Sequence, residues 1–324
     1  MNSKSETLLT KPKNNDVVIP GKAEARGRRV RSSLAQRLWH GRWGLLFVAP
    51  FFLLFVVFSV FPIGFSSWLS FQDWNGVPGR EVFVGFENFT FALRDNLFWE
   101  SMFNVFLIFV LHMPIMLFTA LVLAVLLNDN FLRLQGLWRA LIFLPHLTSM
   151  VAAGFTFRLI LEKDSGFANA ALNLLGIADV PWLDDVWWAR ISVALLLLWA
   201  WMGYEMVIFL SALQNIPGEL NEAAMMDGAN RIQIFWHITV PLLKPVIVFC
   251  FTVSLIGTFA LFTEPTILTG GGPIHATATP TMEIFGNAFS NLKYGYAAAL
   301  SYIYFLIVVV ATLVQLRFTQ RGGA

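Results

Sequence analysis

Residues 44–71 read GLLFVAPFFLLFVVFSVFPIGFSSWLSF and contain no charged side chain. An α-helix needs about 20 mostly apolar residues to cross about 30 Å of bilayer hydrocarbon. This run is long enough, and its Pro50 and Pro62 are tolerated in membrane helices, where neighbouring groups can satisfy the freed backbone. It therefore predicts a transmembrane helix, and with it an integral membrane protein.

Five further apolar runs of similar length follow along the chain. They cover residues 101–127, 140–161, 191–213, 246–268 and 294–316. We therefore expect an all-α, polytopic membrane protein with six transmembrane helices. The runs contain few ionisable residues, among them His112, Arg158, Glu205 and Glu264.

The composition of the whole chain supports this class. Hydrophobic residues make up 57% of it and charged residues 13%, and the mean hydropathy is +0.65. Soluble domains carry about 25% charged residues, so this chain has too few polar side chains to cover its outside in water. A formal net charge of +2 is too small to suggest a nucleic-acid partner, and the single Cys250 excludes a disulfide framework within the chain.

The first 38 residues differ in kind from the rest. They are polar and basic and show no apolar period, so we expect a flexible cytoplasmic tail over 1–38 and a transmembrane domain over 39–324. The basic stretch is longer than that of a cleavable signal peptide, and the apolar run that follows it is long enough to span the membrane. We therefore do not expect a signal peptide here. Residues 34–43 carry Leu and Trp at helical spacing and are expected to lie along the membrane interface.

Lys and Arg are concentrated in alternate connecting segments. If the N-terminus is cytoplasmic, the inside segments are the N-terminal tail, residues 128–139, residues 214–245 and the end of the chain after residue 316. These hold 16 of the 22 Lys and Arg residues. Because short basic loops stay in the cytoplasm, both termini are expected inside.

Residues 214–245 form the most informative polar segment. Pro217 suits the first turn of a helix, where its missing N–H is no loss, and Glu219 and Glu222 follow where negative charge is favoured. Gly228 can end that helix in a left-handed conformation. We expect a short helix across the cytoplasmic face, then a second helix that runs to Pro241, where the chain turns back into the membrane.

The same segment carries a motif. It consists of Glu222, Ala223, Ala224, Asp227 and Gly228, followed by Phe235, Ile238 and Pro241. This pattern resembles the EAA motif of the binding-protein-dependent ABC transporter permeases. Residues 84–89, 268–273 and 294–298 also look like this family, in the order of its sugar-importing branch, similar to the maltose and glycerol-phosphate permease subunits. The resemblance extends from about residue 40 to the end of the chain.

The resemblance implies the transmembrane domain of a type I ABC importer in the bacterial inner membrane, passing a sugar or oligosaccharide inward by alternating access. In this family the motif helix, here around Glu222 to Gly228, docks on a cytoplasmic ATPase. The implied partners are two ATPase subunits, a second permease subunit and an external solute-binding protein. The chain has no G-x-x-x-x-G-K-[ST] loop, so we expect ATP and Mg to be bound by the ATPases, with no cofactor and no enzymatic activity in this chain.

Two helix faces suggest a path for the solute. The i, i+3, i+4 spacing groups Trp201, Tyr204 and Glu205. The i, i+4, i+7 spacing groups Ser254, Thr258 and Leu261. Aromatic rings with a few hydrogen-bonding groups suit a sugar. The resemblance adds that the family's sugar-contacting tyrosine and serine match Tyr204 and Ser254, whereas Leu261 replaces a polar residue and leaves the identity of the sugar open.

Simpler roles stay open for these residues. The hydroxyl side chains of the second face could serve helix packing, and Glu205 could pair with a partner subunit. Glu264 lies near the external end of its run and could simply be wetted. His112 has no second ligand spaced to join it in a metal site, and Arg158 is expected to reach toward the external surface.

Two other classes of function would require features that these residues lack. A self-sufficient channel or secondary transporter would show an internal repeat or paired broken helices, and neither is visible in the sequence. An intramembrane enzyme would need paired aspartates, a serine–histidine set or a metal cluster within the spans. Only isolated Glu205, Glu264 and His112 occur there. Co-purification with ATPase subunits would separate a permease from a carrier that works alone.

Overall fold

The computed structural model describes residues 42–128 and 134–321. The expected tail, most of the expected interfacial stretch and residues 129–133 lie outside the described residues. The chain divides into two units, residues 1–59 and 60–324, and the helix packing concerns the second.

The described residues are almost entirely helical, as expected. The helices are α2 (Arg42–Phe55), α3 (Phe61–Leu69), α4 (Glu87–Arg94), α5 (Asn96–Asn128), α6 (Gln135–Phe143), α7 (Met150–Ile160), α8 (Phe167–Leu174), α9 (Val186–Leu213), α10 (Gly218–Met226), α11 (Arg231–Ile234), α12 (Val240–Phe259), α13 (Thr263–Leu268), α14 (Pro280–Phe285) and α15 (Tyr294–Arg321). Short π or 3₁₀ segments are η1 (Val56–Val60), η2 (Leu144–Leu147), η3 (Phe235–Thr239) and η4 (Gly286–Ser290). A two-residue antiparallel pair is formed by β1 (Gln72–Asp73) and β2 (Val82–Phe83).

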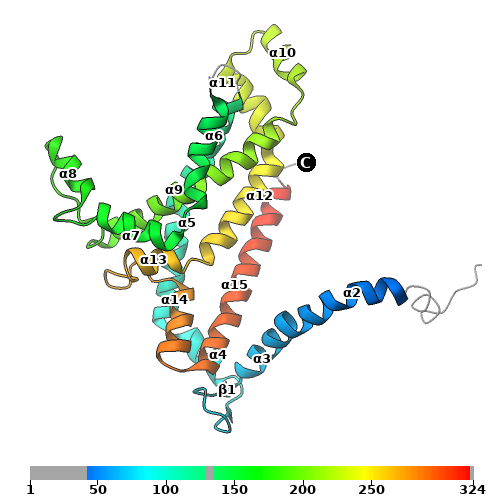
Figure 1. Ribbon diagram of the computed structural model, residues 1–324, viewed down its shortest axis with the longest axis vertical. Helices are drawn as coiled ribbons and strands as arrows, with labels where there is room; N and C mark the ends of the chain where they lie inside the picture. Colours follow the sequence, from blue (N-terminus) through cyan, green and yellow to red (C-terminus); the bar gives the residue numbers. More distant parts are fainter. Residues whose placement is uncertain (1–41, 129–133, 322–324) are drawn as a thin grey trace, which may run out of the picture. The chain divides into compact units, whose positions relative to one another are not determined.

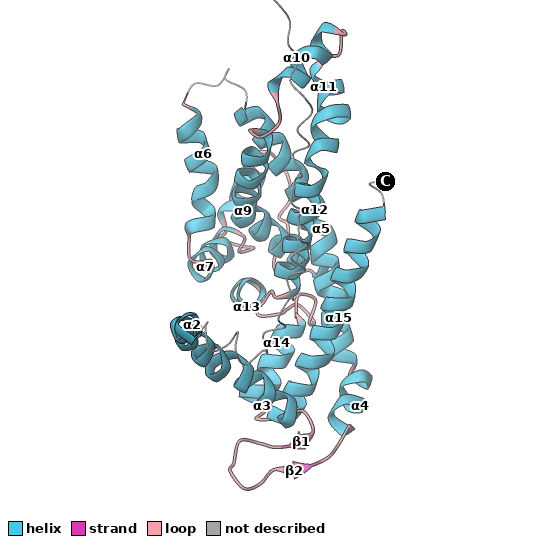
Figure 2. Cartoon of the chain, turned by 90° about the vertical axis from the view of Figure 1, so that its right-hand side faces the viewer, coloured by secondary structure: helices cyan, strands magenta, loops and turns pink. Residues whose placement is uncertain are grey.

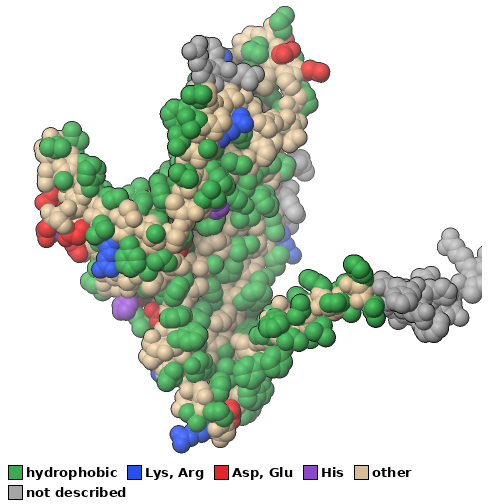
Figure 3. Space-filling view, in the orientation of Figure 1, with side chains coloured by type: hydrophobic (Ala, Val, Ile, Leu, Met, Phe, Trp, Pro, Cys, Tyr) green, Lys and Arg blue, Asp and Glu red, His purple; other side chains and the backbone are tan. Residues whose placement is uncertain are grey.

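The helices confirm the expected number of membrane spans. Among the described residues, five helical segments are long and apolar enough to cross a bilayer, two of them joined from α-helices through a π turn. The bent pair formed by α6 with η2 and α7, counted as one span, makes a sixth. The first, residues 46–69, has no buried side chain in its most apolar stretch, as expected for a helix that needs lipid or another subunit around it. Figure 3 shows mostly hydrophobic and uncharged side chains over the helices in this view, with Lys, Arg, Asp and Glu near their ends.

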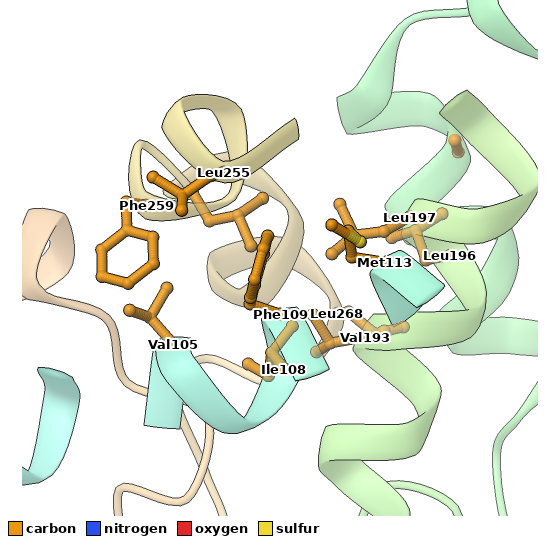
Figure 4. Packing of buried hydrophobic residues seen from close by; sticks show 12 residues of the cluster. Val105, Ile108, Phe109, Met113, Val193, Leu196, Leu197, Leu255, Phe259 and Leu268 are labelled. Atoms are coloured by element: carbon orange, nitrogen blue, oxygen red, sulfur yellow. The ribbon is translucent and has the colours of Figure 1, made fainter. Parts of the chain in front are cut away.

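Helices α5, α9 and α12 form the centre of the packed unit, with α15 against α12 (Figure 1). One apolar cluster joins α5, α9 and α12, and its members include Val105, Ile108, Phe109, Met113, Val193, Leu196, Leu197, Leu255 and Phe259 (Figure 4). A second cluster continues along the same three helices and contains Ala120 and Ala124. Small side chains of this kind let membrane helices approach closely.

The third span is broken, which the sequence analysis did not expect. The helix pair bends by 95° between Leu147 and Met150 (Figure 2). Pro145 is the second residue of the 3₁₀ turn η2, and Thr148 and Ser149 then take extended backbone, with ψ of 150° and 125°. The expectation of an unbroken helix over residues 140–161 is therefore wrong, because two successive extended residues interrupt the backbone hydrogen bonds of the helix.

The chain does not turn at Pro241, so that expectation is also wrong. Helix α11 continues through η3 into α12, and residues 231–259 form one apolar span. The N–H of Val240 donates to the carbonyl of Phe235, five residues back, in a π-helical turn. This turn changes the hydrogen-bond register directly before Pro241, which has no N–H to give, and lets the helix pass the proline.

The fifth expected span also ends earlier than expected. Helix α12 stops at Phe259, and the short helix α13 begins at Thr263. Leu261 therefore lies in the break and not on the same helix face as Ser254. The carbonyl of Leu261 accepts hydrogen bonds from the hydroxyl groups of Thr279, at 2.7 Å, and Thr281. These bonds replace the helical partner that a broken helix loses at membrane depth.

Two segments that resemble the permease family, residues 84–89 and 294–298, meet at the end of the unit opposite α10 (Figure 1). The Asn88 amide donates to the carbonyls of Ser70 at 3.0 Å and Gln72 at 2.9 Å. Gly295 lies against the same strand, where an added Cβ would be 1.8 Å from the carbonyl oxygen of Gln72. The phenol of Tyr296 donates to Asp95 at 2.5 Å. These contacts fix the start of α15 against β1 and α4.

Candidate functional site

The predicted short helix of the polar loop is present as α10. It starts directly after Pro217, has Glu219 in its first turn and contains no buried residue. Glu222 and Ala223 are exposed, Ala224 is half-buried, and Met226 is 88% exposed. No residue of α10 is therefore fully covered by the rest of the unit, and the helix lies at one end of it, where a partner can reach it (Figure 2).

Gly228 ends α10 in the predicted left-handed conformation, with φ of +84°. The N–H of Gly228 donates to the carbonyl of Met225 at 3.0 Å, and the N–H of Ala229 donates to that of Ala224 at 2.9 Å. This pair of bonds is a Schellman motif, which satisfies the last carbonyls of the helix. Asp227 is exposed just before it.

The start of helix α11, after Gly228, is marked in the sequence by a pattern that was not among the predictions. Asn230 caps α11: its side chain accepts from the N–H of Gln233, and the Gln233 side chain accepts from the N–H of Asn230, both at 2.8 Å. Asn followed three residues later by Gln is a capping-box pattern. Hydrogen bonds therefore fix the turn between α10 and α11 on both sides, at the end of α10 and at the start of α11.

The six residues predicted for the solute path line one cavity of about 120 Å³. The cavity lies between α5, α9, α12 and α13, and its wall consists of Trp201, Tyr204, Glu205, Ser254, Thr258 and Leu261 together with His112, Met116, Leu197, Val253, Gly257 and Glu264. Leu261 reaches the cavity from the break after α12, although the helix-face reasoning that selected it is wrong. The structure thus brings together two faces that lie about 50 residues apart in sequence.

Polar contacts cross the cavity wall between helices. Ser254 donates to Glu205 Oε1 at 2.8 Å, and Thr258 donates to the carbonyl of Ser254 at 2.7 Å. His112 Nδ1 lies 2.8 Å from the carbonyl of Ile108, and its Nε2 lies 3.4 Å from the Thr258 hydroxyl. These groups connect α5, α9 and α12 through hydrogen bonds rather than through close packing of small side chains alone.

Glu264, which the sequence allowed to be wetted, is buried, and so is His112. Glu264 is 7% exposed and His112 is 4% exposed, and both line the cavity. Arg158 is exposed near the end of α7. Within the described residues, no group of three or more His, Cys, Asp or Glu side chains could hold a metal ion.

An aromatic cluster stands beside the cavity, and one of its members was missed by the sequence analysis. The ring of His146, from the break in the third span, stacks on Tyr204 with centroids 4.8 Å apart and meets Trp201 edge-on at 4.8 Å. Trp201 and Tyr204 themselves meet at 6.1 Å. His146 is an ionisable residue within the apolar run of residues 140–161, and this position could have marked it as a candidate. Its partners could not be predicted, because they depend on the packing of α6 and η2 against α9.

A glycine lets this cluster form. Gly203 lies between Trp201 and Tyr204, where α9 crosses α6, and an added Cβ would be 2.1 Å from the carbonyl oxygen of Ile142. Any side chain there would separate the two helices, because the contacted atoms belong to the backbone of α6.

The chain matches a known protein family over residues 89–322, described as binding-protein-dependent transport system inner membrane component. The lactose transport system permease protein LacF of Rhizobium radiobacter is 39% identical over 277 residues, which cover 84% of this chain and 92% of LacF. The arabinooligosaccharides transport system permease protein AraP of Bacillus subtilis (strain 168) is 36% identical over 278 residues, which cover 85% of this chain and 87% of AraP.

A solved structure shares the fold. A chain in the crystal structure of a bacterial ABC transporter involved in the import of the acidic polysaccharide alginate superposes with a TM-score of 0.77. The sequence identity is 20%, and the match covers 90% of this chain and 99% of that one. The helical arrangement is therefore shared with a chain of that ABC transporter.

Proposed function

Because this chain belongs to the family of binding-protein-dependent transport system inner membrane components, we propose that it is the permease subunit of an ATP-driven ABC importer for a sugar or oligosaccharide. It is a multi-pass protein of the inner membrane. In the proposed assembly an external binding protein delivers the solute, and alternating access passes it to the cytoplasm. The excess of Lys and Arg in the loops on the α10 side supports cytoplasmic N- and C-termini.

The observation that carries the sugar assignment is the chemistry of the cavity. Trp201 and Tyr204 on α9 offer aromatic faces, and hydrogen-bonding groups come from Glu205 on the same helix and from Ser254 and Thr258 on α12. Sugar rings combine apolar C–H faces with hydroxyl groups and need both kinds of contact. The lactose and arabinooligosaccharide permeases among the relatives support the same class of cargo.

Helix α10 supplies the proposed coupling to ATP hydrolysis. It contains no buried residue, its Schellman motif fixes the turn into α11, and residues 214–217 join its other end to α9. A partner that moves α10 would therefore move α9 and α12, which both line the cavity. Two cytoplasmic ATPase subunits, which would bind ATP and Mg, and a second permease subunit, which we expect to be a different chain, complete the proposed assembly.

Reversing the charge of Glu222 tests the docking role of α10. We expect Glu222→Lys to lower the amount of ATPase retained by the tagged permease by about tenfold, since a charge facing its partner is replaced by the opposite charge. The measurement is the ratio of ATPase to permease after extraction and purification in detergent. The level of the variant in the membrane should equal that of the wild type.

Glu100→Lys provides the matched control, because Glu100 is an exposed glutamate on α5 outside this loop. It should leave the ratio of ATPase to permease unchanged. If Glu222→Lys retains the full amount of ATPase and transports normally, α10 is not the docking element. A wild-type chain that purifies active without any ATPase would instead support a carrier that works alone.

Removing the ring of Tyr204 tests the solute contact. We expect Tyr204→Ala to lower solute-stimulated ATP turnover by about fivefold, because a stacking face worth about 1 kcal/mol is lost, and to lower basal turnover less. Tyr204→Phe keeps the ring and should retain most of the stimulation. Equal falls in basal and stimulated turnover for Tyr204→Ala would speak against a solute contact.

A further inference from the structure

A second cavity lies beside the start of helix α10, at the end of the unit that carries this helix (Figure 2). Its volume is about 510 Å³, within the roughly 300–1,000 Å³ of sites that bind small molecules. Residues at the end of α5, on α6, at and after the end of α9, on α10 and on η3 form its wall. A ligand in this cavity would therefore contact α10 together with the helices around it.

The described residues of this wall include one basic side chain, Arg139 on α6, and no Asp or Glu. The Nη2 of Arg139 donates to the carbonyl of Leu127 at 3.0 Å, near the end of α5. Its Nε is enclosed and cannot reach a ligand. Its Nη1 is not enclosed and has no hydrogen bond to a described residue. The guanidinium group therefore holds the end of α5 and still has a donor for an anion in the cavity.

Thr239 on η3 provides a second donor. Its side chain lines the cavity and is only 9% exposed, yet its hydroxyl forms no hydrogen bond within the described residues. Buried hydroxyl groups in proteins normally have a partner. The Thr239 oxygen keeps accessible surface, so a ligand in the cavity can reach it and become that partner.

The start of α10 is a third feature that favours an anion. Gly218, the first residue of this nine-residue helix, lines the cavity, and no side chain caps the helix there. The unpaired N–H groups at the start of a helix attract negative charge. Glu219 follows in the same turn, but its side chain is exposed and is not part of the wall. Arg139, Thr239 and the start of α10 thus supply donors from three elements around one cavity.

We propose that this cavity, here called the phosphate cavity, binds the phosphate group of a small polar molecule. Phosphate oxygens match a wall that has a guanidinium group, a hydroxyl and a helix start, and whose described residues carry no carboxylate. The described wall has only two aliphatic side chains, Leu213 and Ile216, too few for the acyl chains of a lipid, so a free phosphorylated molecule is the favoured source. Its binding would connect α10 to α6 and η3 and stabilise one position of α10. That consequence, unlike the binding itself, rests on the proposed docking role of α10.

Calorimetric titration of the complete transporter in nanodiscs of phosphatidylcholine tests the site. The probes are glucose 6-phosphate and glucose, which differ only by the phosphate group. We expect glucose 6-phosphate to bind at least about tenfold more tightly than glucose, because hydrogen bonds from a charged donor to a phosphate group are strong. Equal affinities of the two probes would overturn the proposal and leave the proposed transport function in place.

Two variants of the wall locate the binding. Thr239→Val removes a hydroxyl that has no partner among the described residues, so the fold should be kept, and it should weaken the binding of glucose 6-phosphate about fivefold. Arg139→Gln should weaken it by at least about tenfold. Arg158→Gln is the matched control, because Arg158 is exposed on α7 and lies outside the wall. If both wall variants bind the probe as Arg158→Gln does, the phosphate binds elsewhere on the transporter, and the proposal is wrong.

A second lipid mixture separates the two sources of phosphate. Nanodiscs of phosphatidylcholine and phosphatidylglycerol in equal amounts offer anionic head groups at the membrane surface. If these lipids lower the affinity for glucose 6-phosphate in Arg158→Gln but not in Arg139→Gln, head groups compete for the phosphate cavity, which supports the site and identifies lipid as a source. A wild-type chain that retains no ATPase would count against the proposed function alone, because the titration measures binding and needs no ATP hydrolysis.

Discussion

Gly228→Pro is expected to abolish transport while the protein still inserts into the membrane. Gly228 has a φ of +84°, whereas the proline ring fixes φ near −65°. Its N–H also donates to the carbonyl of Met225, and proline has no N–H. Distorting the turn costs about 3 kcal/mol or more, which is a factor of more than about a hundred in the population of the capped loop. Helix α10 would then no longer be held in a fixed position relative to α11, which continues into α12.

The measurement compares solute uptake and ATP hydrolysis in proteoliposomes that contain equal amounts of the complete transporter. We expect uptake to fall at least about a hundredfold, with ATP hydrolysis no longer stimulated by solute. Gly218→Ala is the control, because Gly218 starts the same helix, has no positive φ and has open space at its Cα. If Gly228→Pro transported as well as Gly218→Ala, the geometry of this turn would not matter for transport.

Gly203→Ala is expected to destabilise the folded protein more than any other single methyl addition on α9. The new Cβ would lie 2.1 Å from the carbonyl oxygen of Ile142 and 2.9 Å from the Cα of Phe143. Backbone atoms cannot move aside as a flexible side chain can, so α6 and α9 must separate. We expect a loss of about 3 kcal/mol or more in the free energy of unfolding, at the upper end of what overpacking usually costs.

The thermal midpoint of the purified complex in detergent should fall by about 5 °C or more for this variant. Gly136→Ala, on α6 itself, meets no atom within 4 Å and should leave the midpoint nearly unchanged. Because Trp201 and Tyr204 flank Gly203, uptake by Gly203→Ala should also fall at temperatures where the complex still survives. An unchanged midpoint would mean that α6 and α9 are not in close contact in the membrane.

The positions of the membrane spans follow from the sequence alone. Runs such as residues 191–213 agree closely with helix α9, which ends at the expected Leu213. The reason is that transfer of apolar side chains into lipid and hydrogen bonding within one helix both depend on neighbouring residues. The position at which α10 ends also depends on neighbouring residues in the sequence. Gly228 tolerates the positive φ at little cost, so its place after the short helix that starts at Pro217 predicts the turn.

Breaks within the spans depended on tertiary structure. Residues 140–161 and 246–268 each look like one continuous helix by hydropathy, yet the first bends by 95° and the second stops at Phe259. Pro241, which predicts a turn by local rules, lies in a continuous helix because a π-helical turn precedes it. A break at membrane depth is stable only where other groups satisfy the free backbone, as Thr279 does for Leu261.

The sequence by itself determined a helical membrane protein with a polar loop whose short helix ends at Gly228, and it named six of the twelve residues that line the cavity. Only the tertiary structure decided that these six meet, that His146 stacks on Tyr204, and that a second cavity lies beside α10. Helix spacing predicts which residues share a face, but not which faces meet. Glu205 and Ser254, on different helices, are joined by packing over long sequence distances, for which no local pattern exists.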